Sequence, residues 1–284
     1  MGDFNNTTVY HNNSYSDMDL YHIILFYIEC TVIGLGLPLT LLAISALISL
    51  VRDDHVAPIF VINLLISDLL QICCMILEVA RLDVSIYSIF YWTALMASVG
   101  FMMCVALERC LIVYRPLWYR INRSVKVSVL ICVIVWMFPV VLFILLNMFY
   151  MPIIYAIFFL LPFPVFVFSL VGTLKSLSAS ISVSSEEKRR IVGAVVLVFL
   201  IYVMLFLPIT IYLLPITRPL FLSRFSFTFI RLSPLADLVL YVFMGKGATD
   251  KLRALLCCCR KETQRPKQQV LTVSGDRTGT VSSM

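Results

Sequence analysis

The chain has 284 residues, of which 61% are hydrophobic and 13% are charged, and its formal net charge is +6 at pH 7. A soluble domain carries about a quarter charged residues and could not bury so much apolar surface, so we expect lipid to surround most of the chain. The basic residues gather on one side of the predicted spans. This pattern favours membrane orientation as their role and excludes nucleic acid as the partner.

Residues 1–22 are polar and contain no apolar stretch of the kind found in a cleavable signal peptide. We expect them to form an extracellular tail. Three residues of this tail begin glycosylation patterns of the type Asn-x-Ser/Thr: they are Asn5, Asn6 and Asn12.

Six apolar runs follow the tail, and each is long enough to cross a bilayer, for which about 20 residues suffice. The fourth run is about twice that length and contains no charged residue. The stretch Asn147–Pro152 interrupts it and predicts a short turn between two helices, which gives seven spans. One long tilted helix with a re-entrant segment is the alternative. The runs are Ile23–Leu50, Val56–Val79, Val84–Leu107, Val127–Leu174, Ile191–Leu214 and Leu220–Gly245.

Lys and Arg residues predict the orientation, because they concentrate in the cytoplasmic loops of membrane proteins. With the N-terminus outside, the outer loops hold Arg81, Arg218 and Arg224. We therefore expect a seven-helix bundle over residues 23–245 with an extracellular N-terminus. The inner side then holds the larger set: Arg52, the group from Arg109 to Lys126, Lys175, Lys188–Arg190 and the residues from Lys246 onward.

Five ionisable residues stand out within the apolar runs, where a charge is costly and is usually functional. Glu29, Glu78 and Arg231 have the alternative of reaching toward the outer headgroups, whereas Asp68 and Asp237 lie too deep for it. Because Arg does not easily lose its proton, a buried Arg231 needs an anionic partner. Glu78, Glu29 and the carboxylate or phosphate of a ligand all stay open as that partner.

Motifs in successive runs resemble those of the rhodopsin-like (class A) G-protein-coupled receptors, from Ile23 to about Cys259. The second run holds NLLISDLL with Asp68 as its acid, and the third run ends in Glu108-Arg109-Cys110. That Cys and the following PLWYR are similar to those of the Mas-related receptors within the family. The resemblance implies an all-α membrane protein, a seven-transmembrane helix bundle. The other matching positions are Trp136, Leu207-Pro208 and the stretch DLVLY from Asp237 to Tyr241.

The chain departs from the family pattern at four positions. Thr40 stands in place of the first-helix Asn, Phe206 in place of the sixth-helix Trp and Leu238 in place of the seventh-helix Pro. Lys188 replaces a Glu that often pairs with the third-helix Arg. The level of ligand-independent activity is therefore not predicted.

The resemblance implies a Na⁺ site made by Asp68, Ser98 and Asp237. Two carboxylates so close should not both ionise without a cation or a shared proton, so either could stabilise the resting state. The resemblance also implies a ligand pocket between the outer halves of the third, sixth and seventh helices. The candidate pocket residues are Tyr91, Trp92, Leu95, Phe206, Thr210, Phe227, Arg231, Glu78 and Glu29.

The inner ends of the spans hold the residues expected to couple to a G protein. By resemblance these are Glu108, Arg109 and Tyr241. Pro208 removes a backbone hydrogen bond and offers a bend in the sixth helix. Outward motion of that helix would free Arg109 to contact the G protein.

The nine cysteines are not expected to form a disulfide. Val84 occupies the position of the usual bridging Cys, and the loop around Asn147–Pro152 has none. Residues 246–259 predict a short amphipathic eighth helix ending in Cys257, Cys258 and Cys259, a context that favours palmitoylation. Residues 260–284 are polar and predicted to be disordered, with Ser and Thr residues whose phosphorylation would recruit arrestin.

We therefore expect a plasma-membrane receptor that passes an extracellular signal to heterotrimeric G proteins. An anionic lipid or organic acid at Arg231 is the first expected ligand. The alternatives are a cationic peptide or amine that meets Glu29 and Glu78, and proton sensing. A seven-helix transporter is the non-receptor alternative, although no repeated halves are found. Enzyme motifs such as HExxH and GxSxG do not occur, and no cofactor is expected beyond an allosteric Na⁺.

Overall fold

The computed structural model describes residues 20–53, 59–81, 84–114, 124–149, 152–179, 185–214 and 220–244. Within these ranges the regular structure is helical, and no strand occurs. The predicted all-α class is confirmed. In chain order the elements are a helix over residues 20–31, η1 (Val32–Gly36), α2 (Leu37–Asp53), α3 (Ile59–Val79), α4 (Val84–Tyr114), α6 (Val125–Phe149), α7 (Pro152–Leu160), α8 (Pro162–Ala179), α9 (Ser185–Leu213), α10 (Leu220–Arg231) and α11 (Ser233–Met244).

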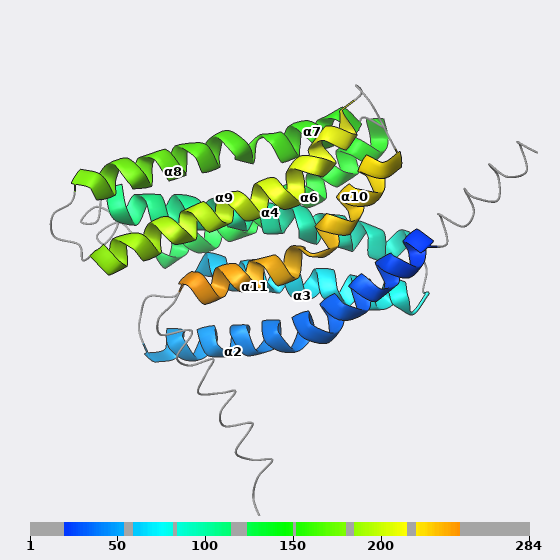
Figure 1. The fold of residues 1–284 in the computed structure, drawn as a ribbon, viewed down its shortest axis with the longest axis horizontal. Coiled ribbons are helices and arrows are strands. Elements are labelled where there is room, and N and C mark those ends of the chain that lie inside the picture. The colour runs from blue at the N-terminus through cyan, green and yellow to red at the C-terminus, as the bar shows by residue number, and fades with distance from the viewer. Residues whose placement is uncertain are drawn as a thin grey trace, which may run out of the picture.

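Most of these helices run side by side along an elongated bundle, with α4 through its middle (Figure 1). α4 packs against α3, α6, α8 and α9. Residues 94–102 of α4 are all buried. A helix that is covered on every side must be apolar all round, which explains why this run shows no clear polar face.

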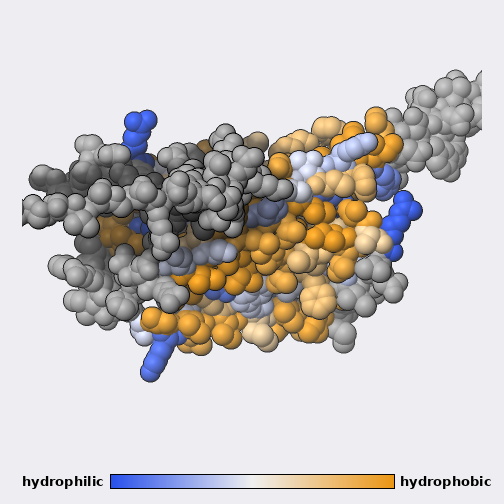
Figure 2. All heavy atoms as spheres, turned by 90° about the horizontal axis from the view of Figure 1, so that it is seen from below, coloured by the Kyte–Doolittle hydropathy of each residue, from blue (hydrophilic) through white to orange (hydrophobic). Residues whose placement is uncertain are grey.

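The outside of the bundle is apolar, as expected for a surface that faces lipid. Leu130, Ile134 and Phe138 of α6 are all more than half exposed. Figure 2 shows hydrophobic residues across much of one face, with hydrophilic side chains projecting near the two ends. Six helices among the described residues are long and apolar enough to cross a membrane, and α10 and α11, bent by 44° at their junction, pass the same test together as one broken span. The prediction of a seven-span bundle is confirmed.

The third span is longer than its apolar run predicted. We expected Glu108 and Arg109 to end the span after Leu107, but α4 continues to Tyr114. A charged pair marks the end of an apolar run without ending a helix, because Glu and Arg are both good helix formers. The next signal that ends a helix in the sequence is Pro116.

The fourth run forms two separate helical segments, as predicted, rather than one long helix. The stretch Asn147–Pro152 contains the junction between α6 and α7. The second segment breaks again between α7 and α8, since Pro162 has no N–H for the carbonyl of Phe158. The hydroxyl of Tyr202 on α9 donates to the carbonyl of Phe159. This hydrogen bond ties the break in the fifth span to the sixth span.

The first and seventh spans each contain an irregular turn next to a proline. Pro38 leaves the carbonyl of Gly34 in η1 without its helical donor, and Pro234 lies just after the junction of α10 and α11. η1 packs against both α3 and α11. A Cβ atom on Gly36 would lie 3.2 Å from Ile72 Cδ1. The lack of a side chain at Gly36 therefore permits the close approach of the first and second spans.

Two further hydrogen bonds join neighbouring spans within the membrane region. Trp136 Nε1 on α6 donates to Asn63 Oδ1 on α3 at 3.1 Å, and Ser169 Oγ on α8 donates to the carbonyl of Ala106 on α4 at 2.7 Å. Each such bond contributes about 0.6 kcal/mol on average in a membrane protein. Their importance lies in setting helix register, because each polar group has few other partners there.

Candidate functional site

A partly buried cluster of three charged side chains joins the first, second and seventh spans. Arg231, the last residue of α10, donates through Nη2 to Glu78 Oε1 at 2.9 Å, and its Nη1 lies 2.6 Å from Glu78 Oε2. Nη1 also lies 3.3 Å from Glu29 Oε1. Arg231 thus pairs with both of the Glu residues between which the sequence could not decide. We call Arg231, Glu78 and Glu29 the ion cluster.

The ion cluster has more acid than base. With all three groups ionised, two carboxylates face one guanidinium and the formal charge is −1. The side chain of Glu78 is 28% exposed, against 6% for Glu29 and 15% for Arg231. Glu78 is therefore the most accessible carboxylate of the ion cluster. The Arg231 guanidinium also lies 4.5 Å from the centre of the Tyr91 ring, a cation–π contact that adds α4 to the cluster.

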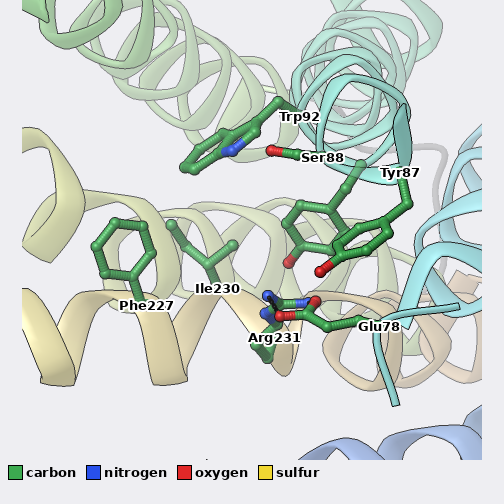
Figure 3. Close-up of a pocket in the computed structure, with 8 residues that line it drawn as sticks. Glu78, Tyr87, Ser88, Trp92, Phe227, Ile230 and Arg231 are labelled. Atoms are coloured by element: carbon green, nitrogen blue, oxygen red, sulfur yellow. Dashed lines mark hydrogen bonds and ion pairs between the residues drawn. The ribbon is translucent and has the colours of Figure 1, made fainter. Parts of the chain in front are cut away.

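A cavity of about 140 Å³ lies beside the ion cluster (Figure 3). Trp92 and Phe227 form an apolar part of its wall, with their rings edge to face and 6.3 Å apart. In Figure 3 the Tyr87 hydroxyl points toward Glu78 and Arg231. The buried Tyr91 hydroxyl has no hydrogen-bond partner in the described part of the chain. The residues that line the cavity are Glu78, Tyr87, Ser88, Tyr91, Trp92, Phe227, Ile230 and Arg231.

The structure brings six of the nine predicted ligand residues to this cavity or its ion cluster. Leu95, Phe206 and Thr210 do not line the cavity. Phe206 is fully buried and stacks on Phe159 and Tyr202, and Thr210 Oγ1 donates to the Phe206 carbonyl at 2.7 Å. These positions pack the interior because α9 meets α7 and α8 there.

Sequence reasoning missed three lining residues, Tyr87, Ser88 and Ile230. The first two lie one helical turn before Tyr91 and Trp92, so they share the same face of α4. That spacing could have predicted Tyr87 and Ser88 from the sequence. The sequence held no such signal for Ile230, since an apolar residue within an apolar run ordinarily serves packing.

Asp68 and Asp237 lie together in the centre of the bundle, and neither is exposed. Their carboxyl groups are near enough for the charge of one to affect the other. Ser98 Oγ donates to Asp237 Oδ2 at 3.1 Å, and Gln71 Nε2 is 3.5 Å from Asp68 Oδ1. One oxygen of each carboxyl group, Asp68 Oδ2 and Asp237 Oδ1, has no hydrogen-bond donor among the described residues. The three residues predicted for a Na⁺ site are thus brought together, and their oxygen atoms suit a hard cation.

The residues predicted for G-protein coupling lie on α4 and α11. Glu108 is 6% exposed and Tyr241 is 2% exposed, while Arg109 is half-buried. Burial is compatible with a role in which these side chains become accessible on helix motion. Their part in coupling stays a prediction.

Several predicted sites fall outside the described residues. They are the glycosylation residues Asn5, Asn6 and Asn12, the eighth helix over residues 246–259 and the palmitoylation residues Cys257, Cys258 and Cys259. The six cysteines for which the structure describes the side chain are free thiols. No group of three or more His, Cys, Asp or Glu that could hold a metal occurs in the described ranges. The absence of disulfides and of a resident cofactor stays a prediction.

Comparison with known proteins finds relatives among membrane receptors. Mas-related G-protein coupled receptor member A4 of Mus musculus is 25% identical over 97 residues, and member B2 of the same species is 24% identical over 153 residues. The human proto-oncogene Mas is 32% identical over 90 residues. The chain is a distant relative of the Mas-related receptors. No family model matches it.

The likeness to the Mas-related receptors is partial in length. The matched stretches make up 31%, 48% and 28% of this chain, and the chain spans 31%, 44% and 28% of these relatives. The resemblance predicted from the order of the motifs is nevertheless confirmed. The chain is similar in sequence to Mas-related receptors and folds into a bundle of apolar helices. Both findings support a multi-pass membrane protein.

Proposed function

We propose that the chain is a G-protein-coupled receptor of the plasma membrane, with its N-terminus outside and heterotrimeric G proteins as partners inside. Relatives that are themselves named G-protein-coupled receptors support this function. So does a partly buried cluster of charges that links several spans. A ligand that binds one helix arrangement better than another shifts the population between them. Arrestin would bind the phosphorylated residues after Arg260.

The proposed ligand site is the cavity beside the ion cluster. Arg231 already has two carboxylate partners, and we base the proposed class of ligand on this observation. An organic anion would have to displace one of them, whereas a cation in the cavity would meet the accessible carboxylate of Glu78 in a cluster with two acids and one base. We therefore favour a cationic amine or peptide over an anionic lipid or acid.

The size of the cavity limits which part of a ligand can enter it. Pockets for whole drug-sized ligands measure about 300–1,000 Å³, and this cavity measures about 140 Å³. It suits an ammonium group with a short apolar or aromatic stem, or one basic side chain of a peptide. Trp92 and Tyr91 offer aromatic faces on which such a cation gains attraction.

Nucleotide exchange on purified G proteins tests the proposal. The full chain in lipid nanodiscs is screened with amines, basic peptides and organic acids, and amines or basic peptides are expected to accelerate exchange. Glu78→Gln should raise the concentration needed about tenfold or more, because it removes a charged partner worth at least 1.4 kcal/mol. Asp19→Asn, which removes the same charge from the predicted tail, should respond as wild type. Ion flux into liposomes without nucleotide exchange would favour the transporter instead.

A further inference from the structure

Arg231 lies between two carboxylates that hold it in different ways. The pair with Glu78 uses both guanidinium Nη atoms and both carboxylate oxygens, at 2.9 and 2.6 Å. The pair with Glu29 is a single contact of 3.3 Å. Glu29 Oε1 is buried and accepts no hydrogen bond within the described part of the chain. The carboxylate of Glu29 therefore lies close to Arg231 Nη1 with unused capacity to accept a hydrogen bond from it.

The two carboxylates also differ in access. Glu78 lines the cavity and has the most exposed side chain of the three. Glu29 does not line the cavity, and its side chain is only 6% exposed. A change in the cavity can reach Glu78 directly, while Glu29 stays shielded behind Arg231.

Arg231 lies directly beside the break in the seventh span. It is the last residue of α10, and α11 begins at Ser233, with a bend of 44° between the two helices. At the junction Leu232 N–H donates to the Phe229 carbonyl, and Pro234 removes a helical donor. Figure 1 shows α10 inclined to α11. The pull of a carboxylate on Arg231 is therefore applied next to the break between the two helices.

We propose that Arg231 is a two-position switch, held by Glu78 in the arrangement seen here and transferred to Glu29 when Glu78 is neutralised or occupied, with a change in the bend of the seventh span. Glu78 is the exchangeable partner, and Glu29 is the partner that takes over Arg231 when Glu78 is lost. Transfer keeps the guanidinium paired, so neither position strands a buried charge. The part of the switch that a ligand would operate rests on the proposed function, but the switch itself does not.

The bend can be measured on purified protein without ligand or G protein, so its outcome is independent of receptor function. Spin-labelled amino acids are placed at Phe221 on α10 and Phe168 on α8, whose side chains are 77% and 68% exposed. α10 has 12 residues and is about 18 Å long, so a turn of about 10° at Leu232 moves its far end by about 3 Å. Electron–electron double resonance resolves such a shift.

Three variants separate the switch from a fixed ion pair. Glu78→Gln should shift the distance between the labels by about 2–4 Å, as Arg231 moves to Glu29 and α10 turns. Glu29→Gln should keep the wild-type distance, since the closer pair with Glu78 is intact. In the double variant Glu29→Gln/Glu78→Gln, Arg231 has no carboxylate in the cluster and the distance distribution should broaden.

An unchanged distance in Glu78→Gln would overturn the proposal, as would equal shifts in the two single variants. If Glu78→Gln does not fold, Glu78→Asp keeps the charge but withdraws the carboxylate by one methylene. It should then give a smaller shift in the same direction, and a wild-type distance would overturn the proposal.

Discussion

The carboxyl groups of Asp68 and Asp237 are both fully buried. Like charges close together at low dielectric do not both persist without a cation or a proton between them. Each carboxyl group retains one oxygen without a donor in the described part of the structure, and Ser98 adds a hydroxyl oxygen. An ion bound at these three residues would restrain α3, α4 and α11 together.

Thermal unfolding in Na⁺ and in N-methylglucamine, at equal ionic strength, tests whether Na⁺ binds at Asp68, Ser98 and Asp237. A cation present at about ten times its Kd stabilises the folded state by about 1.4 kcal/mol. This corresponds to a rise in Tm of roughly 3–6 °C in a chain of this size. We expect wild type to show that rise and Asp68→Asn to lose it.

Ser67→Ala is the matched control for Asp68→Asn. Ser67 is also buried on α3, but its hydroxyl donates to its own helix, at the carbonyl of Leu64. This variant should retain the Na⁺ response. Equal melting of the wild-type protein in the two salts would show that a shared proton, and not Na⁺, accompanies the aspartates.

Contacts between whole elements depend on small residues at a few positions. A Cβ atom on Gly100 of α4 would lie 2.8 Å from Val135 Cγ1 on α6, which is closer than real Cβ contacts. Valine is stiff at χ1 and cannot easily turn its methyl group away. Gly100 therefore sets how closely α4 and α6 approach, as small residues do at membrane helix interfaces.

Gly100→Ala should destabilise the bundle by about 1–3 kcal/mol, because it overpacks this interface. Gly193→Ala is the control, since no atom lies within 4 Å of the position that its Cβ would take on α9. That variant should be stabilised by about 0.5–1 kcal/mol through the higher helix propensity of Ala. Melting temperatures of both variants in one detergent provide the measurement. Shifts of the same sign would contradict the role assigned to Gly100.

At the scale of the whole molecule, the orientation of the bundle follows from the distribution of Lys and Arg. An extracellular N-terminus would expose Asn5, Asn6 and Asn12 to the glycosylation machinery. Asn122 begins the same pattern, Asn-Arg-Ser, but lies between the third and fourth runs, on the predicted cytoplasmic side. A single glycosylation assay can therefore compare the three tail sites, which should carry a glycan, with Asn122, which should not.

Treatment of the membrane-expressed protein with peptide N-glycosidase should increase its gel mobility. The triple substitution of Asn5, Asn6 and Asn12 by Gln should abolish that change, whereas Asn122→Gln should leave it intact. A glycan at Asn122, or none in the tail, would reverse the predicted topology. The site at Glu78 and Arg231 would then face the cytoplasm.

Much of the fold was predictable because lipid imposes a simple rule on sequence. Apolar runs of about 20 residues predict spans, and Asn147–Pro152 correctly divided the fourth run. The end of α4 was missed because the charges at Glu108 and Arg109 mark a polarity boundary and do not end a helix. The breaks before Pro162 and at Leu232 were also missed, since a proline in a membrane helix is tolerated in several geometries.

The candidate site was half predictable, for a related reason. A charged residue within an apolar run is easily recognised in a sequence. Five such residues could therefore be identified from the sequence alone: Glu29, Asp68, Glu78, Arg231 and Asp237. Which of them meet depends on the rotation and tilt of each helix, and these are decided by side-chain packing between spans that are distant in the sequence. Only the folded bundle could therefore assign two carboxylates to one arginine and place one of them in the wall of a cavity.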